Sequence, residues 1–179
     1  MEQPSAQPIL TTERLELCPF AATDEARLFR LYGNSDVMDI RKIGTQSREQ
    51  SQVQLQAIVE HWQSFGFGLW AVTERDSGAF MGECGLRHEQ PGSDNIELSY
   101  GFLPQFWGRG MGSEAARVSL DFGFRTLGME KIYGLAKSRN AASRHILESL
   151  GMSLVEERKD GAETVVRYAA THADYFNDA

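Results

Sequence analysis

Apolar and polar residues alternate with a period of two along residues 94–102, where Ile96, Leu98 and Tyr100 are the apolar positions. This pattern predicts a β-strand with one apolar face. The chain then passes through a glycine-rich loop, and residues 113–127 return to apolar positions at helical spacing. A strand, a glycine-rich loop and a helix in this order place free backbone N–H groups at a helix N-terminus, where they can bind an anion.

The loop carries Gly108, Gly110 and Gly112. Glycines allow an anion to approach the backbone because no Cβ stands in the way. The spacing differs from the GxGxxG fingerprint of dinucleotide-binding folds, and no GKS or GKT follows as it would in a Walker loop. The spacing alone leaves two interpretations open, an anion site of another kind or a tightly packed turn.

The remaining segments alternate between strand-like and helix-like patterns. Strands are predicted at 13–20, 67–75, 79–88, 131–137, 153–158 and 162–170, and helices after Thr23, at 47–64 and at 140–150. Short turns join the early strands, which makes the first half antiparallel, whereas the strand at 131–137 follows a crossover and must be parallel to its predecessor. We therefore expect an α/β fold, with a mixed, mostly antiparallel sheet of six or seven strands and helices on both faces.

The composition is that of one soluble domain: 179 residues, 41% hydrophobic and 24% charged. We expect a disordered lead-in at 1–10, the domain at 11–171 and a polar tail at 172–179. No apolar run is long enough for a transmembrane helix, and the N-terminus lacks a signal pattern. Cys18 and Cys84 have no metal-binding spacing, and we interpret them as buried free thiols in a reducing cytoplasm, with no metal site.

The net charge of −7 argues against nucleic-acid binding, which favours a basic surface. It is compatible with a cationic substrate such as an amine. Many acidic proteins are merely soluble, so this observation only favours such a substrate.

Three segments together resemble the GNAT superfamily of acyl-CoA-dependent N-acetyltransferases: TERLEL, YGFLPQFWGRGMGSEA and SRNAASRHILESLGM. More narrowly, they are similar to the RimJ/RimL-like branch of ribosomal-protein N-terminal acetyltransferases. The resemblance covers almost the whole chain. It implies the GNAT fold, with a central pair of parallel strands that splay apart. It also implies acetyl transfer from acetyl-CoA to a primary amine, either a protein N-terminus or a small amine. A homodimer is common in the family.

The resemblance places Trp107, Gly110 and Gly112 on the family's phosphate-loop pattern, although the family more often has Gln or Arg in place of the tryptophan. A second register, beginning at Gln105, also matches, but the first keeps the following helix in alignment. The first register implies that backbone amides cradle the pyrophosphate of CoA at Gly108, Arg109, Gly110, Met111, Gly112 and Ser113. The Arg109 side chain either contacts a phosphate or is a solvated loop residue.

In the superfamily the strand before this loop bulges, and the pantetheine arm pairs with its backbone like an added strand. Gly101 fits such a bulge. The resemblance implies pantetheine contacts with the backbones of Tyr100, Phe102 and Leu103. An amide near Tyr100 would also stabilise the oxyanion on the thioester carbonyl.

Direct attack by an amine needs a group that accepts its proton. Glu97 is the first candidate for this base, because it lies on the splayed strand and the matching position is often acidic in this branch. A surface glutamate is the competing interpretation. Glu83 on the neighbouring strand is the second candidate; the alternative is that Glu83 is simply an exposed polar residue of an alternating strand. His88, at a strand end, is a weaker third candidate.

The leaving thiolate needs a proton, and many members of the superfamily supply it from a tyrosine seven residues after an asparagine. Counted from Asn140, that position is Leu147, so this acid is absent. The resemblance instead implies Ser143 near the CoA sulfur and Asn140 on the pantetheine. Both also suit the first turn of a helix, with Asn140 as its N-cap.

In this fold the acceptor pocket is formed by residues 32–43, Phe65, Trp70 and the turn at Asp160. These aromatic residues are more often core than pocket. Asp36 and Asp39 could meet a cationic acceptor, or they could be solvated loop acids. A second function stays open as well, that of a non-catalytic acyl-CoA sensor, which would keep the glycine loop and dispense with a base. Glu97 beside the reactive gap favours the enzyme.

Overall fold

The structure, a computed structural model, describes residues 7–41 and 43–177. A single sheet runs through it in the order β1-β2-β3-β4-β5-β6-β8-β7. The strands are β1 (Leu10–Thr11), β2 (Leu15–Pro19), β3 (Leu69–Glu74), β4 (Phe80–His88), β5 (Ile96–Phe102), β6 (Lys131–Lys137), β7 (Ser153–Asp160) and β8 (Glu163–Thr171). The sheet has eight strands instead of the six or seven predicted, because the two-residue β1 extends it beyond β2.

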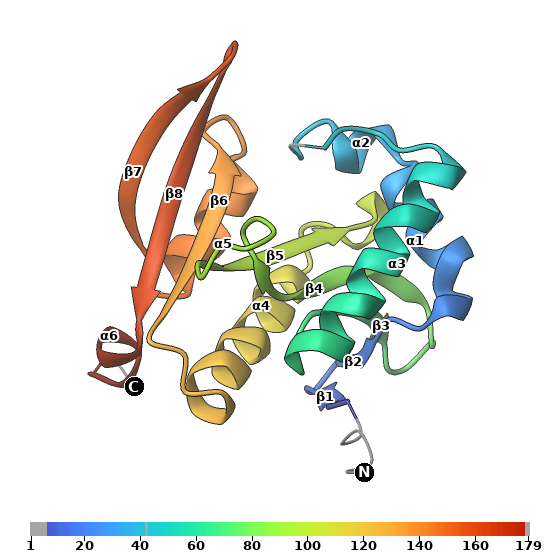
Figure 1. Ribbon diagram of the computed structural model, residues 1–179, viewed down its shortest axis with the longest axis horizontal. Coiled ribbons are helices and arrows are strands. Elements are labelled where there is room, and N and C mark those ends of the chain that lie inside the picture. Colours follow the sequence, from blue (N-terminus) through green and yellow to red (C-terminus); the bar gives the residue numbers. More distant parts are fainter. Residues whose placement is uncertain (1–6, 42, 178–179) are drawn as a thin grey trace.

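The parallel pair at the centre of the sheet is β5 and β6, as predicted, and all other neighbours are antiparallel. Their register comprises only Glu97 opposite Tyr133 and Leu98 opposite Gly134. Beyond these pairs the strands diverge, so that β5 crosses the molecule while β6 and β8 run steeply past its end (Figure 1). The splayed parallel pair of a GNAT fold is therefore present.

Helices cover both faces of the sheet, as neighbouring side chains on β4 show. Glu83 bonds to Tyr32 of the first helix, whereas Cys84, which points to the opposite face, contacts Ser119 of α4. The helices are α1 (Glu25–Tyr32), α2 (Ser35–Met38), α3 (Arg48–Phe65), α4 (Met111–Asp121), α5 (Ala141–Ser149) and α6 (His172–Asn177).

The boundaries of α3 follow directly from its sequence. The Ser47 hydroxyl accepts the N–H of Gln50, and the Gln50 side chain accepts the N–H of Ser47, which forms a capping box. Gly66 ends the helix in a left-handed conformation with φ of 72°. The Trp62 indole then donates to the carbonyl of Leu69 at 2.8 Å, which fixes α3 against β3.

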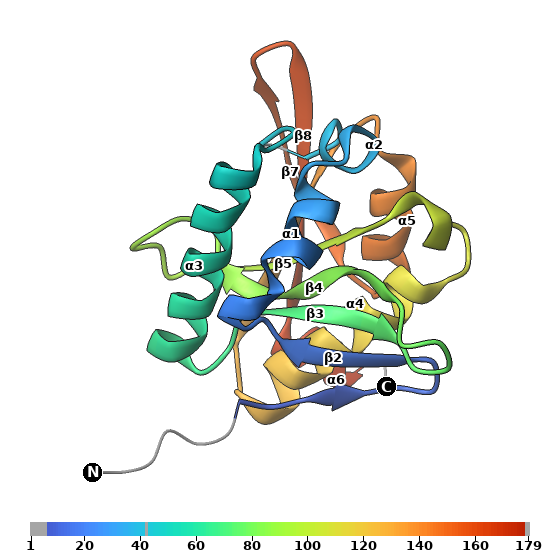
Figure 2. The ribbon, with the colours of Figure 1, turned by 90° about the vertical axis from the view of Figure 1, so that its right-hand side faces the viewer.

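The hairpin of β7 and β8 closes the sheet, with β8 inserted between β6 and β7. Every residue of β7 is exposed. The tip of the hairpin projects beyond the rest of the molecule (Figures 1 and 2).

Two short helices occupy segments that the sequence predicts as irregular. α2 lies within the expected loop at 33–45, where the Asn34 side chain accepts the N–H groups of Asp36 and Val37. α6 lies within the expected tail at 172–179, of which 178 and 179 are outside the described residues. Of the expected lead-in at 1–10, the first six residues are likewise outside, and the Pro8 carbonyl accepts the Trp70 indole at 2.8 Å.

The first helix starts differently from the prediction. Thr23 is not an N-cap, because a 3-10 turn at Ala22–Asp24 precedes α1. The Asp24 carboxylate accepts the N–H of Ala21 at 2.9 Å and so satisfies the start of this turn. The sequence pattern alone could not show that Asp24, and not its neighbour Thr23, supplies the side chain that bonds to the start of this turn.

The predicted bulge at Gly101 is absent, since the register between β4 and β5 runs without a shift from one end to the other. The register shift lies one strand away, between Val72 and Thr73 of β3. Both cysteines are free, as predicted. The prediction that both are buried is correct only for Cys84, because Cys18 is partly exposed.

Within the described residues, we find no helix that combines the length and the apolar character needed to cross a membrane.

Candidate active site

The glycine loop forms an open helix N-terminus between the splayed strands and α4. Gly108 and Gly110 have φ angles of 71° and 73°, a left-handed conformation that favours glycine. Gly110 is the N-cap of α4, and no side chain caps this end. The first-turn N–H groups, which have no partner within a helix, are therefore available to an anion. This start agrees with the register built on Trp107, Gly110 and Gly112.

Gly112 has a packing role, since a Cβ there would lie 3.2 Å from Ile146 Cδ1 of α5.

A brace from the turn between β1 and β2 holds this loop. Arg14 donates from Nε to Glu114 Oε2 at 2.7 Å and from Nη1 to the Arg109 carbonyl at 2.9 Å. The Thr12 hydroxyl donates to Glu114 Oε1 at 2.6 Å. Burial acts to raise the pKa of Glu114, but the hydrogen bonds from Thr12 and Arg14 outweigh it and lower that pKa. The opening TERLEL segment thus contacts the loop directly, a role that the sequence did not reveal.

Arg109 makes an ion pair with Glu74, with Nη2 at 2.8 Å from Oε1. The pKa of Glu74 is lowered by the Ser77 hydroxyl and, to a smaller extent, by Arg109. A phosphate contact by Arg109 stays a prediction, and it would require Arg109 to leave Glu74.

The backbone of β5 is open to the gap at Tyr100 and Phe102 only. The Leu103 N–H donates to the Met81 carbonyl at 2.8 Å, on the β4 side, so this amide is already bonded within the sheet, and a pantetheine contact with the Leu103 backbone stays a prediction. Alternation along an antiparallel ladder turns the N–H and C=O of Phe102 to the opposite side, toward the gap. The Trp107 indole donates to the Phe102 carbonyl at 2.7 Å, which leaves the N–H of Phe102 for a ligand.

The Tyr100 side chain meets α5 at Ser143. Its hydroxyl lies 2.9 Å from Ser143 Oγ and 3.1 Å from the Ser143 carbonyl. Burial, above all, raises the pKa of Tyr100. Asn140 is the N-cap of α5 and accepts the Ser143 N–H at 3.1 Å. The sequence predicts a role for the backbone of Tyr100 but not for its side chain. The Tyr100 phenol is therefore a further candidate beside Ser143, one that the sequence analysis missed.

The position that would hold the family's tyrosine acid is part of the core. Leu147 is buried and lies against Gly134 of β6, where it would be 2.4 Å from an added Cβ.

Glu97 lies in the two-residue segment of β5 that pairs with β6. Its register partners are Tyr133 on β6 and Arg87 on β4. Its carboxylate is 12% exposed, and Oε2 is 3.3 Å from Arg87 Nη2. The candidate base therefore reaches solvent at the point where the strands separate, as the hypothesis requires.

Glu83 is not an exposed strand residue and is not placed to touch an acceptor. It is fully buried and accepts the Tyr32 hydroxyl at 2.9 and 3.0 Å, while Arg41 Nη2 lies 2.7 Å from Oε1. Burial, with a contribution from Glu83, raises the pKa of Tyr32. Tyr32 and Trp70 are core residues, so these two expected pocket aromatics do not line an open site.

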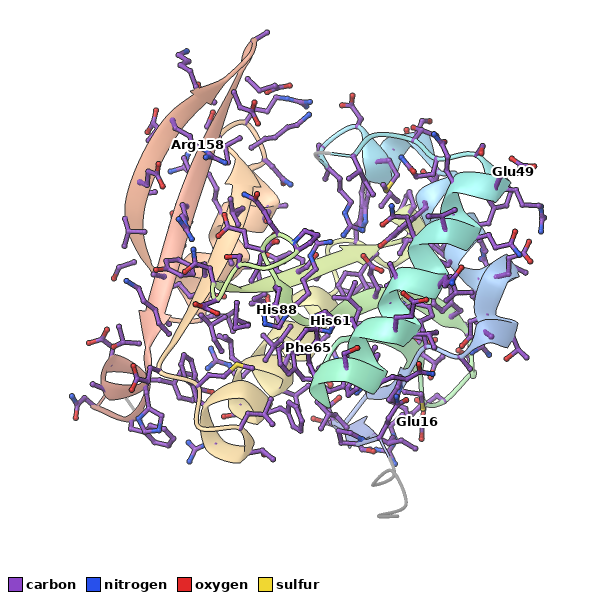
Figure 3. The ribbon with its side chains drawn as sticks, viewed as in Figure 1. Glu16, Glu49, His61, Phe65, His88 and Arg158 are labelled. Carbon is purple, nitrogen blue, oxygen red and sulfur yellow. The ribbon has the colours of Figure 1, made fainter. Side chains whose placement is uncertain are left out.

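His88 has a partner other than Glu97. His61 and Phe65 of α3 lie together with His88 at the end of β4 (Figure 3). His61 Nδ1 is 2.8 Å from the Phe67 carbonyl and must donate to it, so His61 Nε2 accepts from His88 Nδ1 at 2.9 Å. Burial is the main cause that lowers the pKa of His61, which favours its neutral ring. We assign the pair no catalytic role.

Asp39 links the end of α2 to the end of β6, although its side chain is 72% exposed, and its contact with a cationic acceptor stays a prediction. Its carbonyl accepts Lys137 Nζ at 2.8 Å, and its carboxylate is 3.3 Å from Arg139 Nη2. Asp36, in the first turn of α2, is exposed, as expected for a solvated acid.

The part of the chain that the structure describes holds no cluster of three or more His, Cys, Asp or Glu side chains suited to a metal ion. A hollow of about 390 Å³ lies beside the C-terminal half of α4, away from the glycine loop, and is lined in part by Arg117, Asp121 and Tyr175. It is separate from the splayed strands.

Comparisons with known proteins agree with this geometry. The family model described as acetyltransferase (GNAT) domain matches residues 14–153. The uncharacterized protein YkkB of Bacillus subtilis is 31% identical over 150 residues, covering 83% of this chain and 87% of that protein. The FsC-acetyl coenzyme A-N(2)-transacetylase of Aspergillus fumigatus is 30% identical over 188 residues, covering 96% and 79%.

A solved structure of a GNAT-family acetyltransferase from Bacillus anthracis aligns with a TM-score of 0.81 at 20% identity, covering 93% of this chain and 99% of that one. The two chains therefore share the same fold over nearly their whole length. The match of the family model over most of the chain, together with the two relatives, establishes that this chain belongs to the GNAT acetyltransferase family, whose enzymes use acetyl-CoA as co-substrate.

Proposed function

We propose that this protein transfers an acetyl group from acetyl-CoA to a primary amine by direct attack, with Glu97 as the base. The observation that carries the proposal is the position of Glu97 in the short segment of β5 that pairs with β6, next to the point where the strands separate, while the uncapped N-terminus of α4 follows the other end of the same strand. A pyrophosphate at that terminus and a thioester at the splay would lie on one continuous path along β5.

Each residue has a defined task in this reaction. The amides at 108–113 bind the pyrophosphate, and the Tyr100 and Phe102 backbones hold the pantetheine. Glu97 accepts the proton of the attacking ammonium after giving up its contact with Arg87. The new C–N bond replaces the C–S bond, and the thiolate receives a proton from Ser143 or, through it, from Tyr100. The attacking nitrogen loses its second proton in the same step, and this proton restores the hydroxyl that protonated the thiolate. A tetrahedral oxyanion near the Tyr100 amide is stabilised by that N–H.

The acceptor and the branch are also proposals. The block around Trp107 supports the RimJ/RimL-like branch, and within it a protein N-terminus or a small amine is the acceptor. The two free cysteines support a reducing cytoplasm. A homodimer stays a prediction.

The test compares Glu97→Gln with the wild-type protein, using acetyl-CoA, a panel of amines and N-terminal peptides, and thiol release as the signal. Loss of the base should lower kcat by about 10²–10⁴-fold, with an unchanged Kd for CoA measured by calorimetry. The control is Glu157→Gln, which alters an exposed glutamate on β7 and should leave both quantities unchanged.

Normal turnover by Glu97→Gln would remove Glu97 from the mechanism. CoA binding without thiol release for any acceptor would contradict the transferase assignment itself and favour a sensor. Absence of CoA binding would contradict the loop assignment.

A further inference from the structure

Seven residues from four strands share one face of the sheet beside the splay. The registers pair Glu83 with Gly101, Arg87 with Glu97, Glu97 with Tyr133, and Leu135 with Arg167, and alternate residues along a strand share a face. The seven are Glu83, Arg87, Glu97, Ser99, Gly101, Tyr133 and Arg167. This is the face opposite to Tyr100 and Ser143, so it receives the acceptor and not the CoA arm.

Three arginines at this face have a buried nitrogen that lacks a hydrogen-bond partner within the described structure. The atoms are Arg41 Nη1, Arg87 Nε and Arg167 Nε. Their carboxylate partners, in contrast, are bonded, since Glu83, Glu97 and Glu89 each pair with one of the three arginines. Buried donors are almost always satisfied in folded proteins. The buried side-chain atoms at this face that lack a partner are therefore donors, and they favour an oxygen acceptor.

Arg41 is the most firmly held of the three. Its Nη2 is 2.7 Å from Glu83 Oε1 and 3.3 Å from Ser99 Oγ, and its Cζ lies 5.3 Å from the centre of the Tyr32 ring. Nη1 lies against Gly101, where an added Cβ would be only 2.8 Å away. Gly101 thus makes room for the guanidinium at the splayed strand, which explains a glycine here without any bulge.

Arg41 is also close to the candidate base. Burial acts to lower the pKa of Arg41, but Glu83, Tyr32 and, to a smaller extent, Glu97 raise it. Ser99 lies two residues from Glu97 on the same face, about 7 Å along the strand. One acceptor molecule can therefore reach both side chains.

Arg167 lines the opposite side of the same face. Its Cζ lies 3.8 Å from the centre of the Tyr133 ring, and Nη2 is 2.7 Å from Glu89 Oε2. This stacking fixes the guanidinium plane beside Glu97, because Tyr133 and Glu97 are register partners. Arginines therefore lie on both sides of the candidate base, Arg87 on the adjacent β4 and Arg167 on β8, one strand beyond β6.

We propose that the acceptor is an amine that also carries a carboxylate, with Arg41 Nη1 donating to a carboxylate oxygen while Glu97 receives the ammonium. The proposal rests on the proposed function and specifies its substrate class. A polyamine would bring further N–H donors to a face whose uncommitted groups are already donors. The acidic net charge of the chain favoured such a cationic acceptor, and the local arrangement reverses that expectation.

The experiment uses the full chain, acetyl-CoA and matched acceptors: L-amino acids, their carboxamides, and the corresponding amines without the carboxylate. Spermidine and phosphoethanolamine represent a polyamine and a phosphate-bearing amine. For at least one amino acid, kcat/KM should exceed that of its carboxamide and its decarboxylated amine by about tenfold or more, since charge-assisted hydrogen bonds are the strong ones.

Arg41→Gln should remove this preference through a higher KM for the acid, with little change for the carboxamide, and Arg41→Lys should restore part of it. Arg48→Gln is the matched control, because Arg48 also pairs with a glutamate, Glu25, and lies over an aromatic ring, yet it is on the outer surface of α3. The Kd for CoA and the melting temperature check that each variant is folded.

The wild-type comparison does not depend on any variant. Equal or better turnover of the carboxamides, the decarboxylated amines, spermidine or phosphoethanolamine would overturn the proposal while the transferase function stands. Turnover of an N-terminal peptide but of none of these acceptors would overturn this inference alone. Turnover of neither, with CoA bound, would overturn the proposed function and this inference together. An equal loss for acid and carboxamide in Arg41→Gln would show that Arg41 serves the fold and not the acceptor.

Discussion

Replacing Arg14 with glutamine should weaken acetyl-CoA binding although Arg14 itself is not in the glycine loop. Its ion pair with Glu114 is partly exposed, with 42% of the Arg14 side chain accessible, so the pair should contribute about 0.5–1 kcal/mol. The bond to the Arg109 carbonyl is charge-assisted and should contribute about 1.5 kcal/mol. Part of this energy orders the loop before the ligand binds.

We therefore expect two separable effects of Arg14→Gln. The melting temperature should fall by about 2–4 °C, which corresponds to about 1 kcal/mol for a domain of this size. The Kd for CoA should rise about three- to tenfold, because 1.4 kcal/mol is a factor of ten. Scanning calorimetry and isothermal titration measure the two quantities. Arg27→Gln is the control, since Arg27 makes a similar exposed ion pair with Asp24 far from the loop.

The brace also has a defined pH dependence. The pKa of Glu114 is lowered in the folded state from its ordinary value of 4.5. A depressed carboxylate pKa stabilises the fold above 4.5, and this contribution is lost as the pH falls below 4.5 toward the folded value. The difference in stability between wild type and Arg14→Gln should therefore shrink on acidification. A lower melting temperature with an unchanged Kd for CoA would refute the reasoning, because Arg14 would then only fasten the N-terminal strand.

Three further predictions follow from burial and backbone geometry. Burial raises the pKa of Cys84 to about 12, so a thiol reagent at neutral pH should label Cys18 in the native protein and Cys84 only after unfolding; rapid labelling of both would contradict this. The lowered pKa of His61 favours the neutral ring, so the urea midpoint should fall as the pH drops below 6.5, and a midpoint constant from pH 7.5 to 5.5 would oppose it. Gly110→Ala should cost about 1 kcal/mol of stability and weaken CoA binding, whereas Gly128→Ala, with a similar φ of 64°, should cost the same without changing the affinity.

Much of the fold could be predicted because its strands carry a clear period. β6 was predicted at its observed bounds, since its residues alternate between exposed and buried positions. The start of α3 at Ser47 was equally clear, because its capping box is local in the sequence. β1, in contrast, is two residues long and presents no period, and α2 depends on the Asn34 side chain inside a loop.

The site was predictable where backbone geometry defines it and not where distant side chains do. The glycines of the loop indicated the N-terminus of α4 directly. Arg14 reaches the Arg109 carbonyl across 95 positions of sequence, and no local pattern signals such a contact. Alternation placed Glu83 on one face of β4 but could not indicate that Tyr32 and Arg41 cover it there.

The seam between β5 and β6 has a consequence for the cohesion of the whole molecule. Among the residues that the structure describes, two residue pairs are the only sheet pairing that joins the unit β1–β5 to the unit formed by β6, β8 and β7. A pantetheine arm in the gap would act as a further strand and hold the two units together. Ligand at 100 times its Kd adds about 2.7 kcal/mol of stability, and we expect slower amide exchange in β6 and β8 to report it. The resistance of this enzyme to heat and proteolysis would then increase with the concentration of acetyl-CoA.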